Sequence, residues 1–73
     1  MRSTLLATTL VREAHSRSFQ IRTARPAGWE AAEQEDQRIV KQQHYADWHR
    51  VEHALARFAR EIAELREQGW REA

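Results

Sequence analysis

The stretch DWHRVEHALARFAREIAELREQGW, residues 47–70, decides the fold because it carries the clearest periodic pattern in the chain. Its large apolar residues recur at intervals of 3, 4, 3, 4 and 3: Trp48, Val51, Leu55, Phe58, Ile62 and Leu65. This spacing is typical of one face of a helix. Asp47 is placed to act as the N-cap. Gly69 can adopt the left-handed conformation that ends a helix, after which Trp70 can pack back on it. The sequence therefore predicts one helix over residues 47–68.

The apolar stripe of this helix needs a surface on which to pack. Burying its six large side chains would contribute on the order of 10 kcal/mol, at roughly 1.5–3 kcal/mol each. A lone helix cannot bury them, so it requires a sheet, another helix or a second copy of itself. Ala54 and Ala59 flank the stripe and leave it accessible to a flat partner.

The segment before the helix contains strand and turn patterns. SFQIRT, residues 18–23, alternates apolar and polar side chains as a half-buried strand does, and RPAG, residues 25–28, is typical of a turn. WEAAEQEDQRIVKQQHY, residues 29–45, has helical propensity but no single apolar face. It also fits a hairpin with strands over 29–34 and 38–45 and a polar turn, EDQ, between them.

We predict the hairpin because the C-terminal helix needs a flat surface, which three short strands supply. Residues 4–11, TLLATTLV, favour a fourth strand, with a short helix or a mobile arm as alternatives; the whole segment 1–16 is then an extra strand or a mobile basic arm. The predicted fold is α+β: one small domain, residues 1–73, with an antiparallel sheet of three or four strands packed against the C-terminal helix. The alternative fold is a helical hairpin.

Size and composition limit the functional classes. The 73 residues are near the lower limit for a domain that folds without a partner, which favours self-association. The chain has no cysteine, so it has no disulfides or thiolate metal sites, as is usual in a reducing compartment. No apolar run approaches the roughly 20 residues of a membrane span. The basic start lacks the cleavage site of a secretory signal, although its composition also fits an organelle transit peptide. We expect a cytoplasmic protein without membrane contact.

HRVEH, residues 49–53, is the segment that most resembles a metal-binding motif. His49 and His53 are four residues apart, the spacing at which two imidazoles on a helix can share a metal, and the letters match the H-x-x-E-H pattern of inverted zinc proteases. At about 100° per residue, however, both point away from the apolar stripe. A catalytic metal needs a walled site with supporting residues. We therefore expect a solvent-exposed polar face and no cofactor, with the two histidines as the candidate ligands if a metal binds.

Basic residues suggest nucleic-acid binding as an alternative function. Residues 1–25 carry a net charge of +4 and residues 26–73 a net charge of −3. If the predicted strands form one sheet, the face away from the helix would present a basic ribbon: Arg17, Arg22, Arg25, Arg38 and Lys41. Trp29 and Tyr45 could stack on bases. Acidic residues on the middle strand and a pI near 8.4 argue against a continuous phosphate track.

No catalytic arrangement is recognisable in the sequence. Ser3, Ser16 and Ser18 lack neighbouring groups that would activate them, and neither glycine lies in a phosphate-binding pattern. We therefore expect a non-enzymatic interaction module that self-associates or binds a protein partner, with any dimer forming through the sheet edges or the N-terminal arm. Nucleic-acid binding is the alternative, and an exposed histidine metal site is a more remote one.

Overall fold

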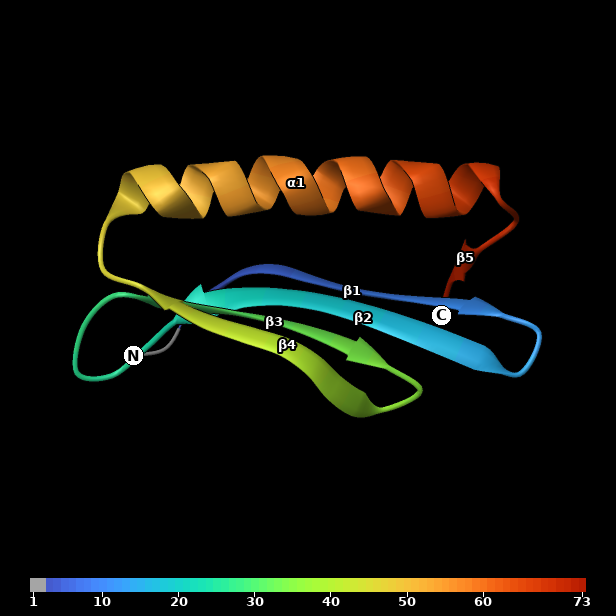
Figure 1. Cartoon of the computed structure of the whole chain (residues 1–73), viewed down its shortest axis with the longest axis horizontal. Coiled ribbons are helices and arrows are strands. Elements are labelled where there is room, and N and C mark those ends of the chain that lie inside the picture. The colour runs from blue at the N-terminus through green and yellow to red at the C-terminus, as the bar shows by residue number, and fades with distance from the viewer. Residues whose placement is uncertain (1–2) are drawn as a thin grey trace.

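The computed structural model, which describes residues 3–73, shows one long helix lying across one face of an antiparallel sheet (Figure 1). The sheet has five strands in the order β4-β3-β2-β1-β5. The elements follow one another along the chain as β1 (Thr4–Arg12), β2 (His15–Thr23), β3 (Trp29–Glu35), β4 (Arg38–Tyr45), α1 (Trp48–Glu67) and β5 (Arg71–Glu72). The predicted α+β class is confirmed, and the alternative of a helical hairpin is wrong.

The predicted hairpin over residues 29–45 forms with its two-residue turn at Asp36 and Gln37. Both turn residues have positive φ, 50° and 69°, which matches the right-handed twist of the flanking strands. Asp36 also contacts the neighbouring hairpin of β1 and β2, because its Oδ1 accepts a hydrogen bond from the backbone N–H of Ser16 at 3.0 Å. The two hairpins are therefore joined at one end of the sheet.

The prediction of three or four strands missed one, the short strand β5. After the helix, Gly69 takes φ +96° and the N–H of Trp70 donates to the carbonyl of Leu65 at 3.0 Å, which turns the chain back toward the sheet. Arg71 and Glu72 then pair with β1. A strand of two residues has no alternation that a sequence pattern could reveal.

The core lies between α1 and the middle of the sheet. Five helix residues are buried: Val51, Ala54, Phe58, Ile62 and Leu65. The sheet contributes five more: Leu10, Phe19, Ile21, Ala31 and Tyr45. At the centre, the rings of Phe19 and Phe58 meet edge to face with 5.2 Å between centroids.

The buried face of α1 is rotated slightly from the predicted stripe. Ala54 is fully buried, whereas Leu55 is half-buried and Trp48 is 45% exposed. A small residue at the centre lets the helix approach the sheet closely, and Leu55 and Trp48 then lie on its flank. Trp48 packs instead on Trp29, with 5.5 Å between ring centroids.

The helix begins and ends where the sequence predicted, and both ends are capped. The side chain of Asp47 accepts a hydrogen bond from the N–H of Arg50 at 3.0 Å, and Gln68 is the C-cap. Within residues 3–73, no helix is long and apolar enough to cross a membrane.

Candidate interaction surfaces

The two flanks of α1 differ in chemistry, and two hydrogen bonds show which strands each flank overlooks. Arg57 donates to the hydroxyl of Tyr45 in β4 at 3.5 Å, so its flank lies toward β4. Arg66 donates to the carboxylate of Glu72 in β5, so the other flank lies toward β5 and the adjoining β1. Charged residues line the first flank, and apolar residues line the second.

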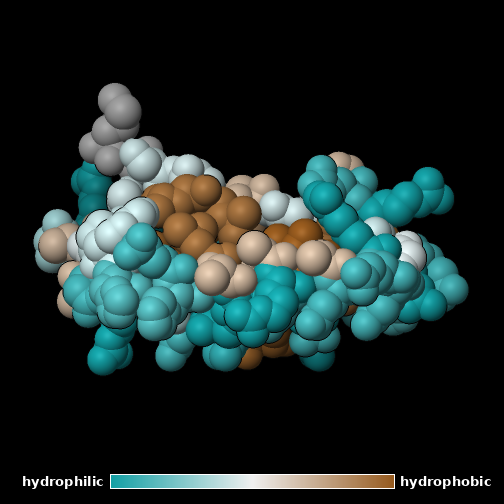
Figure 2. Space-filling view, turned by 90° about the horizontal axis from the view of Figure 1, so that it is seen from above, coloured by the Kyte–Doolittle hydropathy of each residue, from teal (hydrophilic) through white to brown (hydrophobic). Residues whose placement is uncertain are grey.

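The apolar flank forms a surface with β1 that we call the flank patch, made of the half-buried Leu6 and Leu55 and the exposed Ala59, with the largely buried Ile62 at its margin. Leu55 and Ile62 share the flank of Arg66, since they precede it by roughly three and one helical turns. Ala59 lies between them and is exposed. Leu6 is half-buried and pairs with the buried Ile21, which places it on the helix-facing side of β1. Figure 2, seen from the helix side, shows a brown apolar region on this face of the molecule, bordered partly by pale and tan surface and partly by teal, hydrophilic surface.

The outer edge of β1, next to the flank patch, is only partly covered. β5 pairs with Leu10 and Val11, and the N–H of Ala73 donates to the carbonyl of Thr9 at 3.0 Å. Among residues 3–73, no strand lies on the outer side of the rest of β1, from Thr4 to Thr8. No charged residue occurs between positions 3 and 11, although lysines and other charges usually guard such edges. The extra residue of a bulge at Leu5 is the one irregularity in this stretch.

At the opposite edge of the sheet, β4 has no neighbouring strand on its outer side among residues 3–73, but it carries features that disfavour pairing with another chain. Ile39 and Val40 are 57% and 52% exposed. Val40 is the extra residue of a bulge, and Arg38 and Lys41 place positive charge on either side of the apolar pair. A bulge and a lysine are two usual ways of preventing uncontrolled pairing at an edge.

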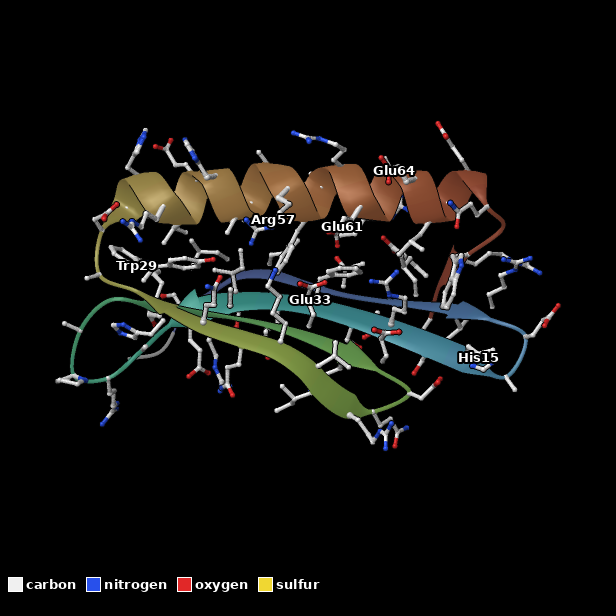
Figure 3. The ribbon with its side chains drawn as sticks, viewed as in Figure 1. His15, Trp29, Glu33, Arg57, Glu61 and Glu64 are labelled. Carbon is white, nitrogen blue, oxygen red and sulfur yellow. The ribbon has the colours of Figure 1, made fainter. Side chains whose placement is uncertain are left out.

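A layer of charged side chains lies between the β4 side of α1 and the sheet. Glu33 of β3 is only 8% exposed, and its Oε1 lies 3.9 Å from Nη2 of Arg17. Figure 3 shows Glu33 pointing into the space beneath α1, on the side from which Arg57 and Glu61 project. In the part of the chain that the structure describes, three buried side-chain atoms have no hydrogen-bond partner: Arg17 Nε, Arg57 Nε and Glu61 Oε2. A cavity of about 10 Å³ beside Glu33 and Arg57 has room for about one water molecule.

This environment makes Glu33 an unusual carboxyl group. Burial raises the pKa of Glu33 above its ordinary value, and the charge of Glu61 and a hydrogen bond to it act in the same direction. Lys41 and Arg17 oppose the rise in pKa, but they do not outweigh it. The sequence contains one signal of this position: by alternation along the predicted strand, Glu33 shares a face with Trp29 and Ala31.

Two of the five predicted nucleic-acid-binding residues lie on the helix-facing side of the sheet. Arg17 pairs with the buried Leu10 and is directed toward Glu33, with 28% of its side chain exposed. Lys41 pairs with Glu33 and therefore lies on the same side. The aromatic residues that could stack on bases are on this side too, since Trp29 packs on Trp48 and Tyr45 is buried.

The other three predicted residues are separated from these and from one another. Arg22 lies on the open face, where its Nη2 donates a hydrogen bond to Oε1 of Glu30 at 2.9 Å. Arg25 is exposed in the connection between β2 and β3, and Arg38 is exposed at the β3–β4 turn. The five residues thus occupy both faces and both ends of the sheet, and the structure does not gather them into one ribbon.

The open face of the sheet has a shallow hollow of about 250 Å³. Its lining is small or uncharged: Ala7, Thr8, Thr9, Ser18, Phe19, Gln20, Ala32 and Gln34. The hydroxyls of Thr9 and Ser18 bond to each other at 3.0 Å. The lining offers no titratable group that could act as an acid or a base.

His49 and His53 lie on the exposed side of α1, with 4.5 Å between ring centroids. In the described part of the chain, no group of three or more His, Cys, Asp or Glu side chains is arranged to hold a metal ion. A metal on this pair would therefore take its remaining ligands from water or from another molecule.

Comparisons with protein-family models, with curated proteins and with solved structures found no match to this chain.

Proposed function

We propose that this protein is a small, non-enzymatic interaction module that associates with a second copy of itself through the flank patch. The observation that carries the proposal is the position of this patch beside the uncovered, uncharged edge of β1. Apolar side chains and free backbone groups thus lie together on one side of a chain of 73 residues. Both kinds of group gain from being covered by another chain.

A second copy suits this surface because the charges at its ends are complementary. On α1, Glu52 and Arg66 lie near the two ends of the row that contains Leu55, Ala59 and Ile62. A two-fold axis near Ala59 would run the two helices in opposite directions, which brings each Glu52 toward Arg66 of the other copy. Such an arrangement places the same patch on both sides of the interface, as closed dimers require.

The size of the chain supports the same conclusion. A domain of this length buries a small fraction of its surface compared with larger domains, and oligomerisation is one of the usual compensations. The non-enzymatic part of the proposal is supported by the uncharged lining of the open-face hollow.

Light scattering on a dilution series tests the proposal. We expect twice the mass of the 8.7 kDa chain at high micromolar concentration, decreasing on dilution. Ala59→Glu should abolish the dimer, because it places a charge at the centre of the patch, while glutamate keeps good helix propensity. The matched control is Ala56→Glu, at another exposed alanine of α1 outside the patch. A wild-type monomer at several hundred micromolar would contradict the proposal.

Nucleic-acid binding remains the alternative proposal, supported by charge alone. Arg25 and Arg38 are exposed, but they lie at opposite ends of the sheet. Titration of labelled duplex and single-stranded DNA and RNA at low salt distinguishes the two functions, because phosphate contacts are strongest there. Binding that weakens steeply with salt would favour this alternative, and no binding would remove it.

A further inference from the structure

We infer that the free edge of β4 accepts an extended acidic peptide as an added strand, with the acidic side chains of the peptide directed toward the helix-facing side of the sheet. This surface lies at the opposite edge of the sheet from the flank patch. The inference therefore does not depend on self-association.

Backbone geometry provides the first part of the argument. β4 is an edge strand of eight residues, and every residue except Tyr45 is exposed. Its outward N–H and C=O groups are available for main-chain hydrogen bonds to an extended peptide, which is the basis of strand addition. The bulge at Val40 leaves Lys41–Tyr45 in regular register with β3, so this part of the strand is the expected site of pairing.

Charge identifies the kind of peptide. β4 carries Arg38 and Lys41 and no acidic residue. Lys41 lies on the helix-facing side and is exposed, whereas Glu33, the acid opposite it in β3, is buried. Arg57 of α1 bonds to Tyr45 on the same side and adds a further positive group. A second copy of β4 would bring like charges together, whereas an acidic strand would bring opposite charges together.

An exposed apolar residue of β4, Ile39, indicates that the other face of the peptide should carry apolar side chains. Ile39 pairs with Gln34, whose neighbours Glu33 and Glu35 belong to the helix-facing side, so Ile39 lies on the open face. It is 57% exposed. A peptide that alternates acidic and apolar residues would direct its acids toward Lys41 and its apolar groups toward the open face, because successive side chains of a strand point to opposite faces. Ile39 lies on that face just beyond the paired stretch, next to the end of the peptide.

The test uses two synthetic peptides of the length of β4, one alternating glutamate and valine and the other alternating lysine and valine. Each is titrated into the isotope-labelled full chain at low salt, and amide shifts are followed by NMR. We expect about tenfold tighter binding of the glutamate peptide, with the shift changes concentrated in β4. Equal binding of both peptides, shift changes centred on β1, or no binding at millimolar peptide would each overturn the inference.

Charge reversal provides the matched variants. Lys41→Glu should weaken binding of the glutamate peptide about tenfold and strengthen binding of the lysine peptide. Arg60→Glu, the same type of change on the exposed side of α1, should alter neither. Because Lys41→Glu adds negative charge beside Glu33, Arg38→Glu serves as a second reversal if the first variant does not fold. A preference for the glutamate peptide that survives reversal in a folded variant would contradict the inference.

Discussion

Gly28 lies so close to the backbone of Tyr45 that a Cβ atom at position 28 would come within 2.5 Å of the Tyr45 carbonyl oxygen. This contact joins the β2–β3 connection to the end of β4, immediately before the helix begins. Gly28 also has φ +88°, a conformation that other residues rarely adopt. The helix therefore starts from a position fixed by a close backbone contact.

Comparison of two glycine variants should separate steric clash from backbone strain. Gly69 has a similar φ of +96°, but a Cβ there would lie 4.0 Å from its nearest neighbour, Nε of Arg12. We expect Gly69→Ala to cost about 1 kcal/mol from strain alone. Gly28→Ala should cost about 2–3 kcal/mol or more, because strain and collision add. Urea unfolding of both variants measures the difference, and equal losses would show that the close approach to Tyr45 has no energetic effect.

The buried carboxyl group of Glu33 should make stability fall as pH rises. Its pKa in the folded state is raised above the ordinary value of 4.5. The folded state therefore binds a proton more tightly than the unfolded state, and this contribution is lost as pH rises through the folded pKa.

Glu33→Gln tests this pH dependence because it removes the buried charge and keeps a hydrogen-bonding side chain. We expect a higher melting temperature than wild type at pH 7–8, with the difference shrinking toward pH 4. Glu35→Gln, at an exposed position of the same strand, is the control and should change the pH profile little. A lower melting temperature for Glu33→Gln at neutral pH would mean that the charged form is stabilised by Arg17 and Lys41.

The contribution of Asp36 to stability should depend on pH in the opposite direction. The pKa of Asp36 is lowered, chiefly by the hydrogen bond from the backbone of Ser16 and then by the hydrogen bond to His15. The stabilisation is therefore fully present above pH 3.8, the ordinary pKa, and is lost as pH falls through the lower folded value. Asp36→Ala should remove this acid-dependent loss and lower the melting temperature at neutral pH. Thermal unfolding monitored by circular dichroism at pH 2.5, 4 and 7 checks this result.

The turn at Gln37 offers a stabilising substitution. Gln37 has φ +69°, and glycine adopts this conformation at no steric cost. We expect Gln37→Gly to raise the unfolding free energy by about 0.5–1 kcal/mol. Gln34→Gly, inside β3, is the control and should lower it. A loss of stability at position 37 would indicate that the glutamine side chain makes contacts that outweigh the backbone strain.

The sequence was sufficient to predict those elements whose pattern is local. The helix was predictable from its six-residue stripe and from Asp47 and Gly69, which mark its ends. The hairpin over 29–45 could be predicted only indirectly, since its composition favours a helix. The deciding consideration was the need of the helix for a flat surface, and the structure confirms that argument.

The candidate surfaces were less predictable because they depend on distant parts of the chain. The flank patch depends on Leu6 of β1 and Leu55 of α1, nearly fifty positions apart, packing against the same core. Alternation along β2 places Arg17 on the same side as Phe19 and Ile21. The side on which Lys41 lies depends instead on the bulge at Val40, which the sequence pattern did not reveal. The buried position of Glu33 depends on where Glu61 and Arg57 lie along α1, which periodicity alone does not determine.

The strand order has a consequence for how the chain assembles. β1 to β4 are neighbours both in sequence and in space, so their pairing requires the closure of short loops only. The pairing of β5 with β1 instead joins segments far apart in the sequence and involves only two residue pairs, Leu10 with Glu72 and Val11 with Arg71. Local contacts of the first kind favour rapid folding. We therefore expect the amides of Arg71 and Glu72 to exchange with solvent long before those of β2 and β3. The pairing of β5 with β1 would then open and close while the rest of the sheet stays intact.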